Sequence, residues 1–141
     1  MNTYILADNQ YITHEGLISL LHRQSGMEGI VTAGSCRELS LQLKIFPCAV
    51  VVVDYTLFDF SSVHHFLNMK SGAKESSWLL FSDELGEAFL RQALLADPTI
   101  SVVMKHDRAE QIIEALRAII NMTFRYLPTT ILPLYMIPGI L

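Results

Sequence analysis

The chain has 141 residues, enough for one domain of ordinary size with a single continuous core. Its composition, 51% hydrophobic and 17% charged, excludes a disordered chain, and no stretch reaches the roughly 20 apolar residues that a membrane span requires. The net charge of −4, with ten Lys plus Arg, argues against a nucleic-acid surface, because phosphate contacts require clustered positive charge.

Short apolar runs alternate with helix-sized segments along the chain. The runs at residues 4–7, 30–33, 49–53, 78–81 and 100–104 are typical of strands. The third run is apolar at every position, as expected for a strand covered by helices on both faces. The sequence therefore predicts an α/β fold: a doubly wound, open sheet of five parallel strands with helices on both faces.

The segments between these runs carry helix signals. Ser35 followed by Glu38 is a capping-box pattern for the second helix, and Asp107 is expected to cap the last one. Four sets of apolar residues recur at helical spacing and are expected to face the core. They are Leu17, Leu20 and Leu21; Leu39 and Leu43; Phe89, Ala93 and Ala96; and Ile112, Leu116, Ile119 and Ile120.

The two ends of the chain differ from this pattern. The N-terminal MNTYILAD has no basic segment followed by a long apolar run, so we expect no signal peptide and a cytoplasmic protein. After Arg125 the chain carries no charge, and Pro128, Pro133 and Pro138 forbid a long regular helix. We interpret residues 1–122 as one domain and residues 123–141 as an apolar, proline-containing linker or truncated tail.

Polar groups follow four of the five predicted strands. Asp8 and Asn9 follow the first, Asp54 the third, Ser82 the fourth and Lys105 the fifth. Because open parallel sheets bind ligands beyond the carboxyl ends of their strands, we expect these groups to converge. Carboxylates there could hold a hard cation such as Mg²⁺, and the hydroxyl and ammonium groups could bind phosphoryl oxygens. The pattern predicts in-line phosphoryl transfer to Asp54.

Four segments resemble the receiver domain of two-component response regulators: ILADNQYITHEGLISLL, AVVVVDYTLFD, LLFSDE and VVMKHDRAEQIIEALRAI. They cover about residues 4–122 and are most similar to receivers of LuxR-type helix-turn-helix regulators. The segment RYLP at residues 125–128 also resembles the linker of those regulators. The resemblance implies a flavodoxin-like topology, with Asp54 as phosphoacceptor, Ser82 as switch hydroxyl and Lys105 beside them. It also implies Mg²⁺ ligands, namely Asp8, Asn9, Asp54 and the Thr56 carbonyl.

The same resemblance implies a signalling function and its partners. A sensor histidine kinase would supply the phosphoryl group, and phosphorylation would switch an output, transcriptional in LuxR-type proteins. We expect no enzyme activity and no membrane contact, and the sequence leaves a homodimer open. DNA binding is expected only through a C-terminal helix-turn-helix domain that this chain lacks.

Three features depart from the receiver pattern and favour an alternative. Asn9 stands where a second acidic residue is usual, which weakens the expected metal site. Leu57-Phe58 replaces Met-Pro, and Val102 replaces a Tyr or Phe whose rotamer reports phosphorylation in receivers. The alternative is a degenerate receiver that acts as a phosphorylation-independent protein-interaction module.

A third class, an aspartyl-phosphate hydrolase or a flavodoxin-like cofactor carrier, is disfavoured. The segment Asp54-Tyr55-Thr56 lacks the second Asp that the hydrolase motif needs two residues after the first. The first strand is also followed by no Gly-rich or Ser/Thr-rich phosphate loop.

Overall fold

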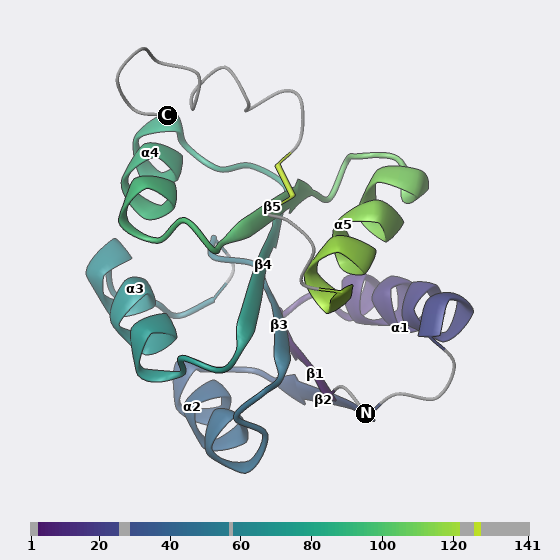
Figure 1. Ribbon diagram of the computed structural model, residues 1–141, viewed down its shortest axis with the longest axis horizontal. Helices are drawn as coiled ribbons and strands as arrows, with labels where there is room; N and C mark the ends of the chain where they lie inside the picture. The colour runs from purple at the N-terminus through teal and green to yellow at the C-terminus, as the bar shows by residue number, and fades with distance from the viewer. Residues whose placement is uncertain (1–2, 26–28, 57, 122–125, 128–141) are drawn as a thin grey trace.

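Five parallel strands form one sheet in the order β2-β1-β3-β4-β5 in the computed structural model (Figure 1). The structure describes residues 3–25, 29–56, 58–121 and 126–127. The strands are β1 (Thr3–Ala7), β2 (Gly29–Ala33), β3 (Val50–Val53), β4 (Ser77–Ser82) and β5 (Ser101–Met104). The helices are α1 (Tyr11–Ser25), α2 (Cys36–Ile45), α3 (Val63–Gly72), α4 (Glu87–Ala96) and α5 (Ala109–Asn121). The predicted fold class is confirmed, and each predicted strand ends within one residue of its observed bounds.

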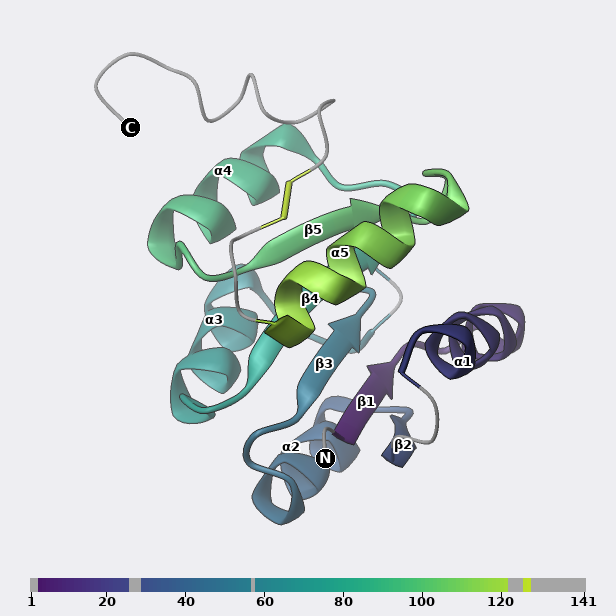
Figure 2. The ribbon, with the colours of Figure 1, turned by 45° about the vertical axis from the view of Figure 1, so that its right-hand side comes forward.

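The helices lie in two layers, with α1 and α5 on one face of the sheet and α2, α3 and α4 on the other (Figures 1 and 2). The buried strand β3 shows why its sequence is apolar throughout. Val51 and Val53 pack into the core under α2, α3 and α4, whereas Val50 and Val52 pack into the core under α1 and α5. Both faces of β3 are therefore covered, as predicted.

The predicted cap of α2 is confirmed with one change. The Ser35 hydroxyl accepts a hydrogen bond from the Glu38 N–H at 3.2 Å. The Glu38 carboxylate, however, accepts from the Gly34 N–H at 2.8 Å, one residue before the position that a capping box uses.

The predicted cap of α5 is wrong. The Arg108 N–H donates to the Gln111 side chain at 3.0 Å, and α5 begins at the next residue. Asp107 instead accepts from the Met104 N–H at 2.9 Å. The turn after β5 is so short that the Asp107 carboxylate reaches back to the strand rather than forward to the helix.

The predicted stripe on α4 is correct only in part. Leu90, Ala93 and Leu94 are the buried residues, Phe89 is half-buried, and Ala96 is exposed. Ala96 is the last helical residue before the C-cap at Asp97.

A buried lysine fixes the turn between α4 and β5. The Lys70 ammonium lies 2.8 Å from the Asp97 carboxylate and donates to the Thr99 hydroxyl at 2.7 Å. Burial alone would raise the pKa of the Asp97 carboxyl, but hydrogen bonds from Lys70 and Thr99 outweigh it and hold the pKa below its ordinary value. The ionised form of Asp97 therefore stabilises the fold.

We expect an Asp97→Asn variant to lose about 2 kcal/mol of unfolding free energy at pH 7, because it leaves Lys70 buried without its carboxylate. The lowered pKa gives a stabilisation that is present above the unfolded-state value and is lost as the pH falls through the folded-state value. Urea unfolding of both proteins from pH 7 down to pH 2 checks this. The two curves should converge as the pH falls through the lowered folded-state pKa of Asp97, and a constant difference would contradict the assignment.

Beyond α5, the structure describes Tyr126 and Leu127, which lie beside the outer strand β5 (yellow in Figures 1 and 2). Tyr126 is 8% exposed and packs into the core under α1 and α5, whereas Leu127 packs against the opposite core. The rest of the predicted linker, residues 123–125 and 128–141, lies outside the described residues. Among the described helices, none has the length and apolar character to cross a membrane.

Candidate functional site

The carboxyl ends of four strands bring Asp8, Asp54, Ser82 and Lys105 together. Strand register produces this, since Ala7 pairs with Val53 and Ser82 pairs with Met104. The hydrogen-bond ladder then continues one residue further. The Asp54 N–H donates to the Ala7 carbonyl at 3.1 Å and the Lys105 N–H to the Ser82 carbonyl at 2.9 Å.

Lys105 links the two carboxylates. Its ammonium lies 2.9 Å from Asp8 Oδ2 and 2.7 Å from Asp54 Oδ2, and the three side chains are between 0% and 8% exposed. Desolvation would lower the pKa of Lys105, but hydrogen bonds and charge from Asp54 and Asp8 outweigh it and raise the pKa above its ordinary value. Two carboxylates and one ammonium leave this buried group with a net negative charge, which favours a cationic ligand.

The second oxygen of Asp54 accepts three hydrogen bonds. Asp54 Oδ1 lies 2.8 Å from the Ser82 hydroxyl, 2.9 Å from the Thr56 N–H and 2.7 Å from the Thr56 hydroxyl. Burial alone would raise the pKa of Asp54, but the donors Lys105, Thr56 and Ser82 outweigh it and lower the pKa. Asp54 is therefore an ionised carboxylate at neutral pH. Thr56 thus lies beside Asp54 through its N–H and hydroxyl, and its carbonyl as a metal ligand stays a prediction.

Two neighbours of this site were not predicted. Gln10 accepts from the Lys105 ammonium at 2.7 Å, and its N–H donates to Asp8 Oδ1 at 2.8 Å. The His14 ring Nε2 is hydrogen-bonded to the Asp8 carbonyl. Their signal in the sequence is spacing, because Gln10 closes a tight turn two residues after Asp8 and His14 lies one helical turn further along α1.

Asn9 is exposed and lies toward the end of β2. Its Oδ1 is 3.8 Å from the position that a Cβ on Gly34 would take. The contacts above place Asp8 against Lys105 and beside Asp54. A role for Asn9 as a metal ligand therefore stays a prediction.

An aromatic cluster joins the loop after Asp54 to α4. The Tyr55 ring stacks on Phe89 of α4 at 4.1 Å between centroids, and on Phe60 at 5.6 Å. Phe66 of α3 meets Tyr55 edge to face at 5.6 Å. Sequence reasoning missed this cluster, although the density of aromatic residues between 55 and 66 was a signal for it. Tyr55 gives the loop after β3 a direct contact with α4.

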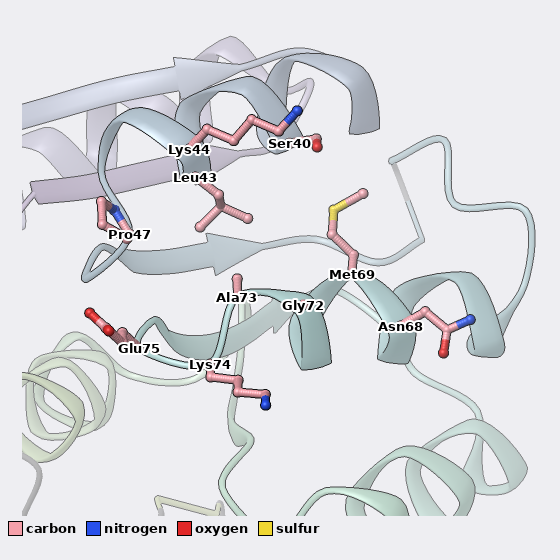
Figure 3. Close-up of a pocket in the computed structure, with 10 residues that line it drawn as sticks. All are labelled: Ser40, Leu43, Lys44, Pro47, Asn68, Met69, Gly72, Ala73, Lys74 and Glu75. Atoms are coloured by element: carbon pink, nitrogen blue, oxygen red, sulfur yellow. The ribbon is translucent and has the colours of Figure 1, made fainter.

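Cavities in the described part of the chain include two that lie at opposite ends of the sheet. A shallow one of about 280 Å³ opens beside the site, with Gln10, Leu17, Phe81 and Lys105 in its lining. The larger, of about 550 Å³, lies between α2 and α3 at the amino ends of the strands (Figure 3). Its charged lining consists of exposed Lys44, Lys74 and Glu75, and no residue of the site described above lines it. We therefore place the candidate chemistry at the carboxyl ends.

The chain has the fold of a response-regulator receiver domain. No protein-family model and no curated protein matches the sequence, but solved receiver structures match the fold. The isolated REC domain of RcsB from Salmonella enterica serovar Typhimurium, solved in the presence of phosphomimetic BeF₃⁻, superposes with a TM-score of 0.80. It is 17% identical over 95% of this chain and 99% of that chain.

Two longer structures are also similar. A LuxR-family two-component response regulator from Aurantimonas gives a TM-score of 0.74 and 22% identity, covering 98% of this chain and 91% of that chain. A longer RcsB chain from Salmonella typhimurium, studied for DNA interaction, gives a TM-score of 0.80 and 19% identity, covering 95% of this chain. The present chain spans 66% of that longer chain. At these identities the likeness establishes the fold.

Proposed function

We propose that this chain is a phosphoacceptor receiver of a two-component system, taking a phosphoryl group on Asp54 from a sensor histidine kinase. The observation that supports this best is the convergence of Asp8, Asp54, Ser82 and Lys105 at one edge of the sheet. The test is incubation with acetyl phosphate and Mg²⁺ followed by intact mass measurement. The same proposal includes a transcriptional output, which phosphorylation would control through a separate DNA-binding domain. It also includes a cytoplasmic location.

Asp54 acts as the nucleophile. Its lowered pKa keeps the carboxylate ionised at neutral pH, which is the form that attacks phosphorus. One carboxylate oxygen forms a bond to phosphorus while the bond from phosphorus to the donor's histidine nitrogen breaks. The electron pair returns to that nitrogen, which then takes a proton from water. The product is an acyl phosphate on Asp54.

The donors that now bind Asp54 are placed to meet the incoming charge. The Ser82 hydroxyl, the Thr56 N–H and the Lys105 ammonium all lie within 2.9 Å of an Asp54 carboxylate oxygen. Small shifts would bring them to phosphoryl oxygens attached to that carboxylate. Because these donors are already fixed, little reorganisation is needed when the transferring group develops negative charge.

The donor set fits a hard divalent cation. Asp8 and Asp54 supply two buried carboxylates, the ligands that Mg²⁺ prefers, and their net charge with Lys105 is negative. Bound Mg²⁺ would neutralise charge on the phosphoryl group. The described residues contain no group of three His, Cys, Asp or Glu side chains arranged for a metal. We therefore propose that neutral oxygens, from Asn9 and the Thr56 carbonyl, complete the site and that binding is weak.

An Asn9→Asp variant is expected to bind Mg²⁺ about tenfold more tightly, because a carboxylate replaces a neutral amide at a hard-cation site. Isothermal titration calorimetry measures the change. The matched control is Asn68→Asp, which adds the same charge at an exposed position of α3 that lines the cavity between α2 and α3. Equal tightening in the control would show a net-charge effect, and unchanged or weaker binding in the Asn9 variant would remove Asn9 from the site.

The second candidate function is a phosphorylation-independent interaction module on the same fold. Exposed Asn9, and Val102 buried in the core of β5, are the observations that favour it. Under this alternative the chain keeps the ion pairs of Lys105 for stability and gains no mass from acetyl phosphate. The intact mass experiment therefore separates the two candidates.

A further inference from the structure

Strand β5 is the last strand of the sheet, so one of its sides faces away from β4. The Lys105 N–H donates to the Ser82 carbonyl, and Ser82 pairs with Met104 in the β4–β5 register. Backbone groups alternate in direction along a strand. The N–H groups of Val102 and Met104 therefore point to the open side, where an edge strand can pair with another chain.

Both of these outward N–H groups are bonded. The Met104 N–H donates to Asp107 Oδ2 at 2.9 Å, and the Asp107 N–H returns a bond to the Met104 carbonyl at 3.0 Å. The Val102 N–H donates to the Tyr126 carbonyl at 2.9 Å. The first cover comes from the turn directly after β5, whereas the second comes from a segment beyond α5.

Tyr126 and Leu127 sit on this edge as a short strand would. The Tyr126 N–H donates to the buried Ser101 hydroxyl at 3.0 Å. The Tyr126 side chain packs with the core under α1 and α5, and the Leu127 side chain packs against the core on the other face of the sheet. Consecutive side chains on opposite faces are the pattern of extended backbone. The two residues thus bind the edge by backbone and by both side chains.

We propose that Tyr126–Leu127 is an edge strap that prevents β5 from pairing with a second copy of this chain. The strand sequence SVVM benefits from such a cover, because it is apolar and rich in valine and has no charge or proline of its own. A second copy is the occupant that fits the uncovered edge, since two identical edges are self-complementary in antiparallel pairing. The strap is independent of phosphorylation.

The strap is tested by removing the Tyr126 side chain from the core under α1 and α5. In Tyr126→Ala, residue-resolved hydrogen exchange at low micromolar protein should show the Val102 amide exchanging at least about tenfold faster, because the bonding carbonyl is no longer held in place. The Met104 amide, bonded to Asp107, should be unchanged. In sedimentation equilibrium, the dimer fraction of the variant should rise with concentration above that of the parent at the same concentration.

Three further variants make the result specific. Tyr11→Ala removes a tyrosine that is 74% exposed and should change neither exchange nor association. Asp107→Ala should release the Met104 amide and leave Val102 protected. Ser101→Ala removes only the acceptor of the Tyr126 N–H, so it gives a milder test if Tyr126→Ala fails to fold.

Two results would overturn the strap. One is a Val102 amide that stays as protected as in the parent in both Tyr126→Ala and Ser101→Ala. The other is a Val102 amide that exchanges rapidly in a variant that remains monomeric at every concentration, because an uncovered edge would then not pair with a second copy. Neither result bears on whether Asp54 accepts a phosphoryl group.

Discussion

An Asp54→Asn variant is expected to gain no mass on incubation with acetyl phosphate and Mg²⁺, whereas the parent chain gains one phosphoryl group that base removes. The reason is chemical, since the amide lacks the ionised oxygen that attacks phosphorus and an acyl phosphate cannot form. The effect should be complete rather than partial, because in the structure Asp54 is the carboxylate held by Lys105, Ser82 and Thr56 together. Intact mass spectrometry measures both proteins directly.

The matched control is Asp83→Asn, which removes an exposed carboxylate one residue after Ser82, in the lining of the cavity beside the site. Asp83 is not bonded to the donors that surround Asp54 in the contacts described above, so this variant should be labelled like the parent. Equal labelling of the Asp54→Asn protein would refute Asp54 as phosphoacceptor. A parent that gains no mass, with its fold intact, would instead favour the phosphorylation-independent module.

The strand ends of this site were predictable because two local signals agree. Apolar runs such as residues 49–53 identify buried strands, and the first polar residue after each run identifies its end. Parallel pairing then brings Asp8 and Asp54 to one edge without any further information. The ion pair of Lys105 with both carboxylates follows from that geometry and from burial.

The contacts that sequence reasoning missed are those made across long chain separations or in competition with a local rule. Asp107 has the residue type of a helix cap, yet in this short turn its carboxylate accepts a hydrogen bond from the Met104 N–H. The Tyr55–Phe89 stack requires knowing how the loop after β3 approaches α4. Tyr126 reaches Val102 only because the chain beyond α5 returns to the sheet edge. None of these pairings has a fixed spacing in the sequence.

A Ser82→Ala variant is expected to accept the phosphoryl group but to lose most of the structural response. Labelling should persist because Lys105 and Thr56 still bind Asp54. The Ser82 hydroxyl is fully buried and donates to Asp54 Oδ1 at 2.8 Å, and β4 continues from Ser82 into the loop before α4. Phosphorylation that draws this hydroxyl to a new acceptor should therefore pull on the loop and on α4.

The size of the response follows from the energy of that one contact. A hydrogen bond to a charged group contributes about 1.5 to 3 kcal/mol, whereas reversing a two-state equilibrium from 1:99 to 99:1 requires about 5.5 kcal/mol. We therefore expect a partial population shift in the parent, seen as moderate changes in hydrogen exchange over residues 82–96 on phosphorylation. Those changes should be largely absent in Ser82→Ala. Ser77→Ala, at the amino end of β4, is the matched control and should respond like the parent.

The Tyr55–Phe89 stack offers a second route from Asp54 to α4, and the same measurement distinguishes the two. A Phe89→Leu variant keeps an apolar side chain on α4 but removes the ring that stacks on Tyr55 at 4.1 Å. If Ser82 carries the signal, phosphorylated Phe89→Leu should retain the exchange changes over residues 82–96 that Ser82→Ala loses. The reverse result, a full response in Ser82→Ala and none in Phe89→Leu, would contradict the role of Ser82 and assign the coupling to the aromatic contact.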